Sequence, residues 1–506
     1  MSDSRLLSNL LNKLEVLKEN EEYEFKEAAD AIPKSFWDTY SAFANTSGGF
    51  ILLGISDSRA HRIIGVSNAE KIKRDLFNTA NNPTKVSHCV LENDDVKEHE
   101  IDGKIIISVY VRELRLDQKP LYLHDNIAHS YIRKNEADCR ASKEDIRRFI
   151  RNSSDDIDAE LLDGYTLEDL NPNSILSFKS IMHKRKPDRQ YMSMDDLHFL
   201  TEMSVFRVDR KDRRTLKLTL AGLLFLGKFD AITQKLPHFH LDYLNRRGET
   251  STRWRDRVST GDIDCPDMNL FEFYQTVREK LRYSVEDKFE LDGRSVRKPS
   301  SELNTALREA LANAIIHADY LDPETAIQVT VDNLYYTFLN PGKMRISETE
   351  FFLGGYSNPR NNMLIQYFRN MGESERAGTG GREIIGIASK NEYRMPDLYT
   401  DLKLTKLRIW SATPADSYDD LSEAAQKILR YIHKKTSATK SDIKKNCSLS
   451  DHYARKAIDE LLRKKIIYVF GKGRAIRYCW SPSVLETLDF ANRLSDSMRK
   501  IPSLKS

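Results

Sequence analysis

Two short acidic stretches interrupt the apolar patterning of this chain and divide it into segments. Residues 153–160 read SSDDIDAE and residues 414–420 read PADSYDD, and such polar compositions are typical of linkers. A chain of 506 residues also exceeds what one hydrophobic core supports, and its length predicts about three to four domains. A new helical pattern begins near residue 300. We therefore expect four domains, at residues 1–155, 156–300, 301–413 and 414–490.

Apolar runs of strand length alternate with helical patterns, which predicts a multidomain protein of the α+β and α/β classes. The first domain opens with leucines at helical spacing over residues 6–17. Strands are expected at residues 50–55, 105–111 and 131–132, and a closing helix at residues 142–150. In the third domain a long helix starting near residue 300 precedes strands at 327–331, 334–339 and 404–410.

Composition limits the partners only weakly. There are 79 basic and 76 acidic side chains, so the formal net charge is only +3, which neither requires nor excludes nucleic acid. The five cysteines are scattered and form no C-x-x-C pair, so a zinc site or disulfide framework is not expected. We find neither a signal-peptide pattern nor an apolar run of about 18 residues. These features predict a cytoplasmic protein without a membrane partner.

Acidic residues gather near the first strands. Glu24 and Lys26 lie on either side of Phe25, so in a strand they share one face. Asp57 follows the apolar run that begins after Gly48 and Gly49. Carboxylates beside a lysine can hold a divalent metal ion against a phosphodiester and activate a water. The alternative is that these acidic residues are merely solvated at strand ends, as most are.

Several ordered motifs of the first domain resemble the AlbA-like domain of the Schlafen family. The family run E-x-x-x-x-E-F-K is matched by Glu19 and residues 24–26, and the run A-F-A-N-T-x-G-G is matched by residues 42–49. The turn G-x-x-D is matched by residues 54–57, and I-x-G-V is matched by the segment that ends at Val66. The later run Y-x-R is matched by residues 131–133. The resemblance implies that Glu19, Glu24 and Asp57 bind Mg²⁺ or Mn²⁺ and, with Lys26, cleave RNA. It also places Arg133 and Lys134 among the candidate nucleic-acid contacts.

The same resemblance leaves two functions open. The first is a metal-dependent RNA endonuclease, acting on structured RNA such as tRNA and serving in defence against phage. The second is binding without cleavage, as in an ATP-sensing, DNA-binding transcriptional regulator. Nucleases of this family clamp RNA between two such lobes and this chain shows one, which predicts a homo-oligomer, most simply a twofold dimer.

A polar stripe marks the long helix of the third domain. Glu309, Asn313 and His317 are spaced four residues apart and share one helical face, whereas the opposite face is apolar. Downstream, residues 339–342 read LNPG and residues 375–384 read ERAGTGGREI. A glycine-rich loop that opens a helix lets backbone N–H groups approach phosphates.

In this order the three elements resemble the C-terminal module of RecG-like ATP-binding proteins, a branch of the GHKL ATPases. The matched motifs are the R-E-A-L-x-N-A-x-x-H-x-D-Y run at residues 308–320, the N-P-G turn, the S-N-P-R-N run at residues 357–361 and the E-x-x-G-T-G loop. The resemblance implies ATP as ligand. Asn313 would hold Mg²⁺ and Glu309 would orient the attacking water. The remaining implied nucleotide contacts are His317, Asp319, Asn340, Gly342, Gly378, Gly380 and Gly381.

The module departs from the wider GHKL pattern at one position. Asn340 stands where an aspartate usually reads the amino group of adenine. An amide can still accept a hydrogen bond from that group. The base preference and the hydrolysis of the nucleotide are therefore open.

The fourth domain has the pattern of a winged helix: three helices at residues 423–432, 439–444 and 450–463, then a hairpin whose strands flank Gly471 to Gly473. Arg455 and Lys456 lie on the outer face of the third helix, where they suit a major groove, and Lys472, Arg474 and Arg477 of the wing suit phosphates. The alternative is a winged helix used for protein contact.

Three other patterns are interpreted as ordinary surface or core. Residues 222–229 read GLLFLGKF, which fits a phosphate-loop spacing but lacks its Ser or Thr, so a buried helix is expected. The basic clusters HKRK at residues 183–186 and RVDRKDRR at residues 207–214 are interpreted as solvated surface. The segment 156–300 offers no motif that indicates a chemistry.

Overall fold

The computed structural model describes residues 22–56, 62–153, 156–212, 215–248, 254–263, 265–291, 301–355, 357–373, 378–418, 420–435, 437–470 and 476–480. Glu19, Asp57, Lys472 and Arg474, and the predicted helix over residues 6–17, therefore lie outside the described residues. The chain divides into two compact units, one of residues 1–155 with 401–403 and one of residues 156–400 with 404–506.

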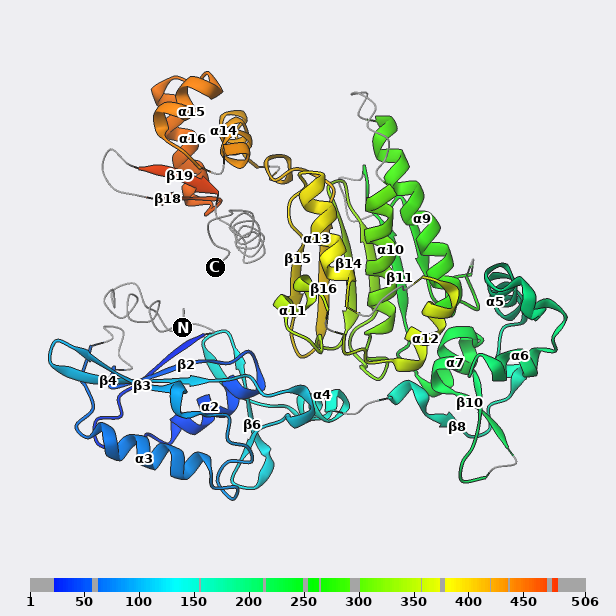
Figure 1. The fold of residues 1–506 in the computed structure, drawn as a ribbon, viewed down its shortest axis with the longest axis horizontal. Coiled ribbons are helices and arrows are strands. Elements are labelled where there is room, and N and C mark those ends of the chain that lie inside the picture. Colours follow the sequence, from blue (N-terminus) through cyan, green and yellow to red (C-terminus); the bar gives the residue numbers. More distant parts are fainter. Residues whose placement is uncertain are drawn as a thin grey trace, which may run out of the picture. The chain divides into compact units, whose positions relative to one another are not determined.

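The first unit is built on a four-stranded sheet with the order β1-β2-β4-β3 (Figure 1). Its strands are β1 (Tyr23–Lys26), β2 (Gly49–Leu53), β3 (Val96–Ile101) and β4 (Lys104–Val111). β1 pairs with β2 in parallel and the other pairs are antiparallel. Helices α2 (Ser35–Asn45) and α3 (Ala69–Ala80) bury their apolar faces in one core with the sheet. The strands predicted at residues 50–55 and 105–111 are confirmed.

A smaller sheet with the order β5-β6-β7 completes this unit. It contains β5 (Tyr122–Leu123), β6 (Asn126–Lys134) and β7 (Ala137–Arg140), and α4 (Lys143–Ser153) follows. Ser142 and Asp145 cap α4 reciprocally, because the Ser142 N–H donates to the Asp145 carboxylate and the Asp145 N–H donates to the Ser142 hydroxyl.

The second unit begins with a three-stranded sheet of order β8-β10-β9 and the helices around it. These elements are β8 (Leu161–Leu162), α5 (Pro172–Arg185), α6 (Asp196–Glu202), β9 (Phe206–Val208), β10 (Leu216–Thr219), α7 (Leu220–Leu226) and α8 (Phe229–Lys235). Every residue of α7 is buried, so the phosphate-loop look-alike is a core helix, as predicted.

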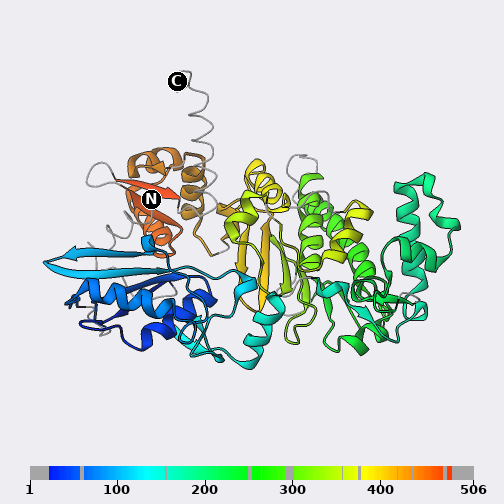
Figure 2. The same cartoon turned by 60° about the horizontal axis from the view of Figure 1, so that its bottom comes forward.

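A six-stranded mixed sheet with the order β12-β11-β13-β14-β16-β15 forms the centre of this unit. Its strands are β11 (Leu241–Asn245), β12 (Asp256–Ser259), β13 (Ile327–Val331), β14 (Tyr335–Pro341), β15 (Asp397–Thr400) and β16 (Leu404–Trp410). The neighbouring helices are α9 (Leu270–Leu291), α10 (Ser301–Ile316), α11 (Glu348–Leu353), α12 (Asn362–Met371) and α13 (Gly380–Lys390). Figures 1 and 2 show α9, α10 and α13 on one face of the sheet.

This sheet crosses the boundary that the sequence suggests near residue 300. β11 pairs with β13 in parallel, with Tyr243 opposite Val329. One hydrophobic core also runs without a break from Leu162 to Ile409. Hydrophobic patterning reveals single elements but not which distant strands pair, so the sequence alone does not show that this sheet joins residues from both sides of position 300.

The C-terminal elements are α14 (Glu423–Lys435), β17 (Ser437–Ala438), α15 (Lys440–Cys447), α16 (Asp451–Arg463), β18 (Ile467–Phe470) and β19 (Arg477–Trp480). They share a separate small core (Figure 1). The sheet order is β17-β19-β18. Helix α15 begins with a reciprocal cap between Thr439 and Asp442. The element order is the one that a winged helix requires.

Candidate functional site

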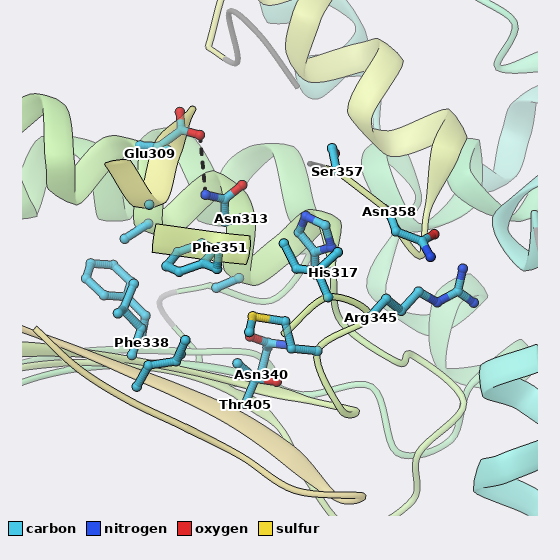
Figure 3. Close-up of a pocket in the computed structure, with 18 of the residues that line it drawn as sticks. Glu309, Asn313, His317, Phe338, Asn340, Arg345, Phe351, Ser357, Asn358 and Thr405 are labelled. Atoms are coloured by element: carbon cyan, nitrogen blue, oxygen red, sulfur yellow. Dashed lines mark hydrogen bonds between the residues drawn. The ribbon is translucent and has the colours of Figure 1, made fainter. Parts of the chain in front are cut away.

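A pocket lies between α10, strands β14 and β16 of the sheet, and the start of α13 (Figure 3). The space that atoms leave open within it is about 960 Å³, part of which is open to solvent. Seven of the predicted nucleotide contacts line it: Glu309, Asn313, His317, Asn340, Gly378, Gly380 and Gly381. The residues come from three separate segments of the chain, so the fold brings the predicted motifs together.

Glu309 and Asn313 form the polar end of this pocket. They lie one turn apart on α10, and the Asn313 Nδ2 atom donates to the Glu309 carboxylate at 3.3 Å (Figure 3). Gly380, the first residue of α13, packs against both side chains. A Cβ atom at Gly380 would lie 2.5 Å from Glu309 Oε1 and 3.0 Å from Asn313 Nδ2. Only glycine therefore lets the N-terminus of α13 approach α10 so closely.

The sheet supplies the opposite side of the pocket. Asn340 on β14 and Thr405 on β16 are direct cross-strand partners and both line the pocket (Figure 3). The Asn340 amide donates to the Pro341 carbonyl at 3.2 Å, and the Thr405 hydroxyl donates to the Gly342 carbonyl at 2.9 Å. Phe338 and Leu407 add apolar surface. This side combines a flat apolar surface with hydrogen-bonding groups, as the site of a heteroaromatic ring requires.

His317 follows the end of α10 and faces the pocket (Figure 3). Loss of solvent, together with the nearby positive charges of Arg360 and Arg345, lowers its pKa to about 4. The imidazole is therefore neutral at pH 7. It can donate or accept one hydrogen bond there but adds no positive charge for a phosphate.

Two predicted nucleotide contacts, Asp319 and Gly342, do not line the pocket. Asp319 is buried beyond the end of α10, where its N–H donates to Pro341 at 2.9 Å. Gly342 has a φ of +93°, and a Cβ there would lie 3.0 Å from the Asp319 side chain. Both residues shape the turn after β14 and so position Asn340 indirectly.

Residues of the pocket that the sequence prediction missed include Lys343, Arg345, Phe351, Ser357, Asn358 and Thr405. Lys343 and Arg345 directly follow the N-P-G turn, and Ser357 and Asn358 belong to the S-N-P-R-N run, which was matched without a role. The rest of that run is structural. Asn361 donates to the carbonyls of Ile316 and Ala318 at 2.8 and 2.9 Å, which holds the C-terminal end of α10.

Glu24, the predicted metal ligand of the first unit, is buried and paired with two cations. Its Oε1 atom lies 2.5 Å from Lys26 Nζ, and its Oε2 atom lies 2.7 Å from an Arg133 nitrogen. Arg133 also pairs with Asp138 at 2.7 Å and lies over the Phe43 ring. Both carboxylate oxygens are therefore engaged. Over the described residues, no group of three or more His, Cys, Asp or Glu side chains is placed to hold a metal ion.

The predicted nucleic-acid contacts differ in their exposure. The Arg133 side chain is only 2% exposed, so its guanidinium serves the ion pairs around Glu24, whereas its neighbour Lys134 is exposed. In the C-terminal domain Arg455, Lys456 and Arg477 are exposed. These three, together with Lys134, are positioned where phosphates can reach them.

One acidic residue moderates the charge at the start of α16. Asp451 pairs with Lys440 and Lys444, each at 3.0 Å, and lies 3.5 Å from Arg455. Hydrogen bonds from the two lysines lower the pKa of Asp451 to about 2. Lys456 is not part of this group and is exposed on the third helix.

Comparisons with known proteins identify two segments. Residues 19–142 match the family model of Schlafen, AlbA_2, which confirms the resemblance of the first domain. Residues 147–242 match a domain of unknown function (DUF8451). A search of curated proteins gave no match.

Two solved structures align with the chain. The crystal structure of the DIP2311 protein from Corynebacterium diphtheriae aligns over 95% of this chain and all of that chain, with 15% identity and a TM-score of 0.36. The solution structure of the N-terminal domain of a putative ATP-dependent DNA helicase RecG-related protein from Nitrosomonas europaea covers 27% of this chain and 92% of that chain, with 24% identity and a TM-score of 0.21. Within the described part of the chain, none of the helices has the length and apolarity needed to cross a bilayer.

Proposed function

We propose that this protein binds an ATP-type nucleotide in the pocket between α10, strands β14 and β16, and α13, and that it acts on nucleic acid in response. The observation that carries the proposal is the convergence of Glu309, Asn313, Asn340 and the glycine-led start of α13 around one pocket. These groups are suited to different parts of a nucleotide, and they come from three separate motifs of the chain.

The phosphates are assigned to the end of the pocket at α13. The first N–H groups of a helix are not used inside the helix, and the helix dipole favours negative charge there. Gly378, with a φ of +81°, and Gly380 allow the backbone to come close. Lys343 and Arg345 bring positive charge to the same pocket.

The base is assigned to the side formed by Asn340, Thr405 and Phe338. Asn340 is the group that reads the exocyclic amino group of adenine, since its amide oxygen accepts a hydrogen bond. The pocket also fits Mg²⁺ at Asn313, because the amide oxygen of this residue is a hard oxygen donor. A bound Mg²⁺ would neutralise phosphate charge, and Glu309 would orient a water against the terminal phosphate.

Nucleotide binding is tested by calorimetry on the full chain with ATP and Mg²⁺. Asn313→Ala removes the proposed metal ligand and is expected to weaken binding by at least about tenfold, whereas Glu309→Gln is expected to keep binding and lose any hydrolysis. Lys406→Gln, on the strand position next to Thr405 but on the other face, is the matched control. Equal affinity of wild type and Asn313→Ala would contradict the proposal.

Of the two candidate actions on nucleic acid, we favour that of a regulator that binds nucleic acid without cleaving it. The match of residues 19–142 to Schlafen, AlbA_2 supports nucleic acid as partner, and the exposed cations of the C-terminal domain support DNA. The ion pairs of Glu24 with Lys26 and Arg133 favour binding over cleavage, since a metal ion would have to displace both cations. The dimer that the single lobe predicts is part of the same proposal.

Cleavage remains the second candidate, with Glu19 and Asp57 as its remaining carboxylates. Incubation of the protein with total RNA and Mg²⁺ or Mn²⁺, with and without ATP, separates the two. The regulator predicts intact RNA. Discrete fragments that disappear in Asp57→Asn would establish the nuclease.

A further inference from the structure

The middle of the chain repeats the strand arrangement of the C-terminal domain. In both places a two-residue strand precedes two helices, and two further strands follow as a hairpin. The sheet orders are β8-β10-β9 and β17-β19-β18, and in both sheets the last strand pairs antiparallel with each of the others. From the first strand onward, the arrangement of residues 161–219 (Figure 1) is therefore that of a winged helix as well, with a short 3-10 helix, Ile157–Ala159, in the place of α14.

The connection from the second helix to the hairpin agrees bond for bond. After α6, the N–H groups of Met203, Ser204 and Val205 donate to the carbonyls of Phe199, Thr201 and Leu200. After α16, those of Lys464, Lys465 and Ile466 donate to Glu460, Leu462 and Leu461 in the same register. The middle residue of each turn is left-handed, with a φ of +63° at Ser204 and +55° at Lys465.

The hairpin β9–β10 carries the basic cluster of residues 207–214. Arg207, Arg210 and Lys211 are exposed, and Arg213 and Arg214 lie outside the described residues. Asp209 fixes the base of the loop, because it accepts the Lys211 N–H at 2.8 Å and pairs with Lys217 at 2.7 Å. The Asp209 N–H donates to the Thr215 carbonyl at 3.1 Å and closes the hairpin. Arg210 and Lys211 therefore lie beside hydrogen bonds that fix the base of the hairpin.

Helix α6 has the opposite character. Its exposed residues include Asp196 and Glu202, and Asp196 pairs with Lys179 at 2.6 Å. Carboxylates of this kind repel a phosphate backbone, so the helix is a poor reader of a groove. The exposed cations of residues 161–219 lie at the end of α5 and on the wing rather than on α6. Those of the wing suit backbone contacts, which carry affinity without sequence information.

We propose that residues 161–219 are a second winged-helix module whose β9–β10 wing binds the phosphate backbone of a nucleic-acid duplex without reading its sequence. The inference deepens the nucleic-acid function proposed above and rests on it. The C-terminal module, with Lys456 on an exposed helix, then supplies contacts that reach bases, and the middle module supplies the anchor.

The competing use of this hairpin is contact with another protein. Val208 and Leu216 are cross-strand partners and are 44% and 39% exposed. Two apolar side chains beside three exposed cations make a small apolar area within a charged surface, which favours the duplex.

The test is fluorescence anisotropy of the full chain with labelled 30-base-pair duplexes, one DNA and one RNA, between 50 and 200 mM salt. Arg210→Gln with Lys211→Gln is expected to lower DNA affinity about tenfold. It should also make the slope of log K against log salt shallower by about 1.8, since each lost B-DNA phosphate contact contributes about 0.9. Lys184→Gln with Lys186→Gln removes equal charge from the end of α5 and should leave the slope unchanged. The DNA and RNA arms show which duplex is preferred.

Each other outcome overturns the inference. An unchanged slope in the wing variant, together with weaker binding by Lys456→Gln, would refute the wing while leaving the proposed function intact. Wild type that binds neither duplex would refute both. If Val208→Ser with Leu216→Ser changes the mass in light scattering while the charge variant binds normally, the hairpin is a protein contact.

Discussion

The two acidic sites that motifs indicate in this chain, Glu309 and Glu24, have opposite surroundings. Glu309 lines an open pocket, next to Asn313 and the glycine-led start of a helix. Glu24 is buried, and each of its carboxylate oxygens is held by a cation. A glutamate in a family motif can serve a ligand directly only where the fold leaves space beside it. The pocket meets that condition, whereas both carboxylate oxygens of Glu24 are already paired with cations.

The largest expected effect distinguishes the two glutamates by stability. Glu24→Ala leaves Lys26 buried without its partner and Arg133 with Asp138 alone, and breaking a buried ion pair costs about 3–5 kcal/mol. Glu309→Ala is expected to cost less than about 1 kcal/mol, because the pocket already admits water. Urea unfolding gives both values, and hydrogen exchange of β2 peptides assigns the loss to the first unit. A Glu24→Ala protein as stable as wild type would mean that Glu24 is available to a metal ion.

The next effect is the pH dependence of stability, which tests whether His317 is shielded from solvent in the pocket. His317 is neutral in the fold with a pKa of about 4, against 6.5 for the free side chain. Unfolding therefore takes up a proton between these values, and stability falls as the pH drops from 6.5 toward 4, by about 3 kcal/mol in total. In His317→Gln this part of the pH dependence should disappear. Urea midpoints at pH 7.5, 6.0 and 4.5 provide the measurement, with exposed His452→Gln as control. Parallel curves for wild type and His317→Gln would show that the imidazole is solvated.

A smaller effect is expected from two glycine substitutions in α13, one that fills space in the pocket and one that only changes the stability of the helix. Gly380→Ala places a methyl group against Glu309 and Asn313, so nucleotide affinity should fall at least about tenfold, or about 1.4 kcal/mol. Gly386→Ala, on the same helix, meets nothing within 4 Å and should leave affinity unchanged while stabilising α13 by up to about 1 kcal/mol. Titration with a fluorescent ATP analogue compares the two. Equal nucleotide affinities of Gly380→Ala and Gly386→Ala would show that the nucleotide does not bind in this pocket.

The motifs predicted which residues line the pocket, but they did not predict that Glu24 is buried and paired with two cations. The difference lies in how far apart in the sequence the interacting residues are. Glu309 and Asn313 interact across one helical turn, so periodicity alone places them together. Lys26 is two residues from Glu24 and its place on the same face was predictable. Arg133 is 109 residues away, and no local pattern could show that it closes the site.

Pairing between distant strands also explains why the sequence did not reveal the arrangement of residues 161–219. The helices and strands of residues 161–219 are short, and the first strand has only two residues, too few for an alternating pattern. The winged-helix order appears only once β10 is seen to pair with both β8 and β9. The basic run at residues 207–214 was visible in the sequence, but its place on a hairpin was not.

The most direct test of the central claim is the linkage between nucleotide and nucleic acid. The measurement is the affinity of the full chain for duplex DNA with and without a non-hydrolysable ATP analogue and Mg²⁺, in wild type and Asn313→Ala. We expect the analogue to change the DNA affinity of the wild type by at least about fivefold. Because linkage is reciprocal, DNA should change the affinity for the analogue by the same factor. In Asn313→Ala the analogue should leave the DNA affinity unchanged. DNA binding that is indifferent to the analogue in wild type, although the analogue is bound, would contradict it.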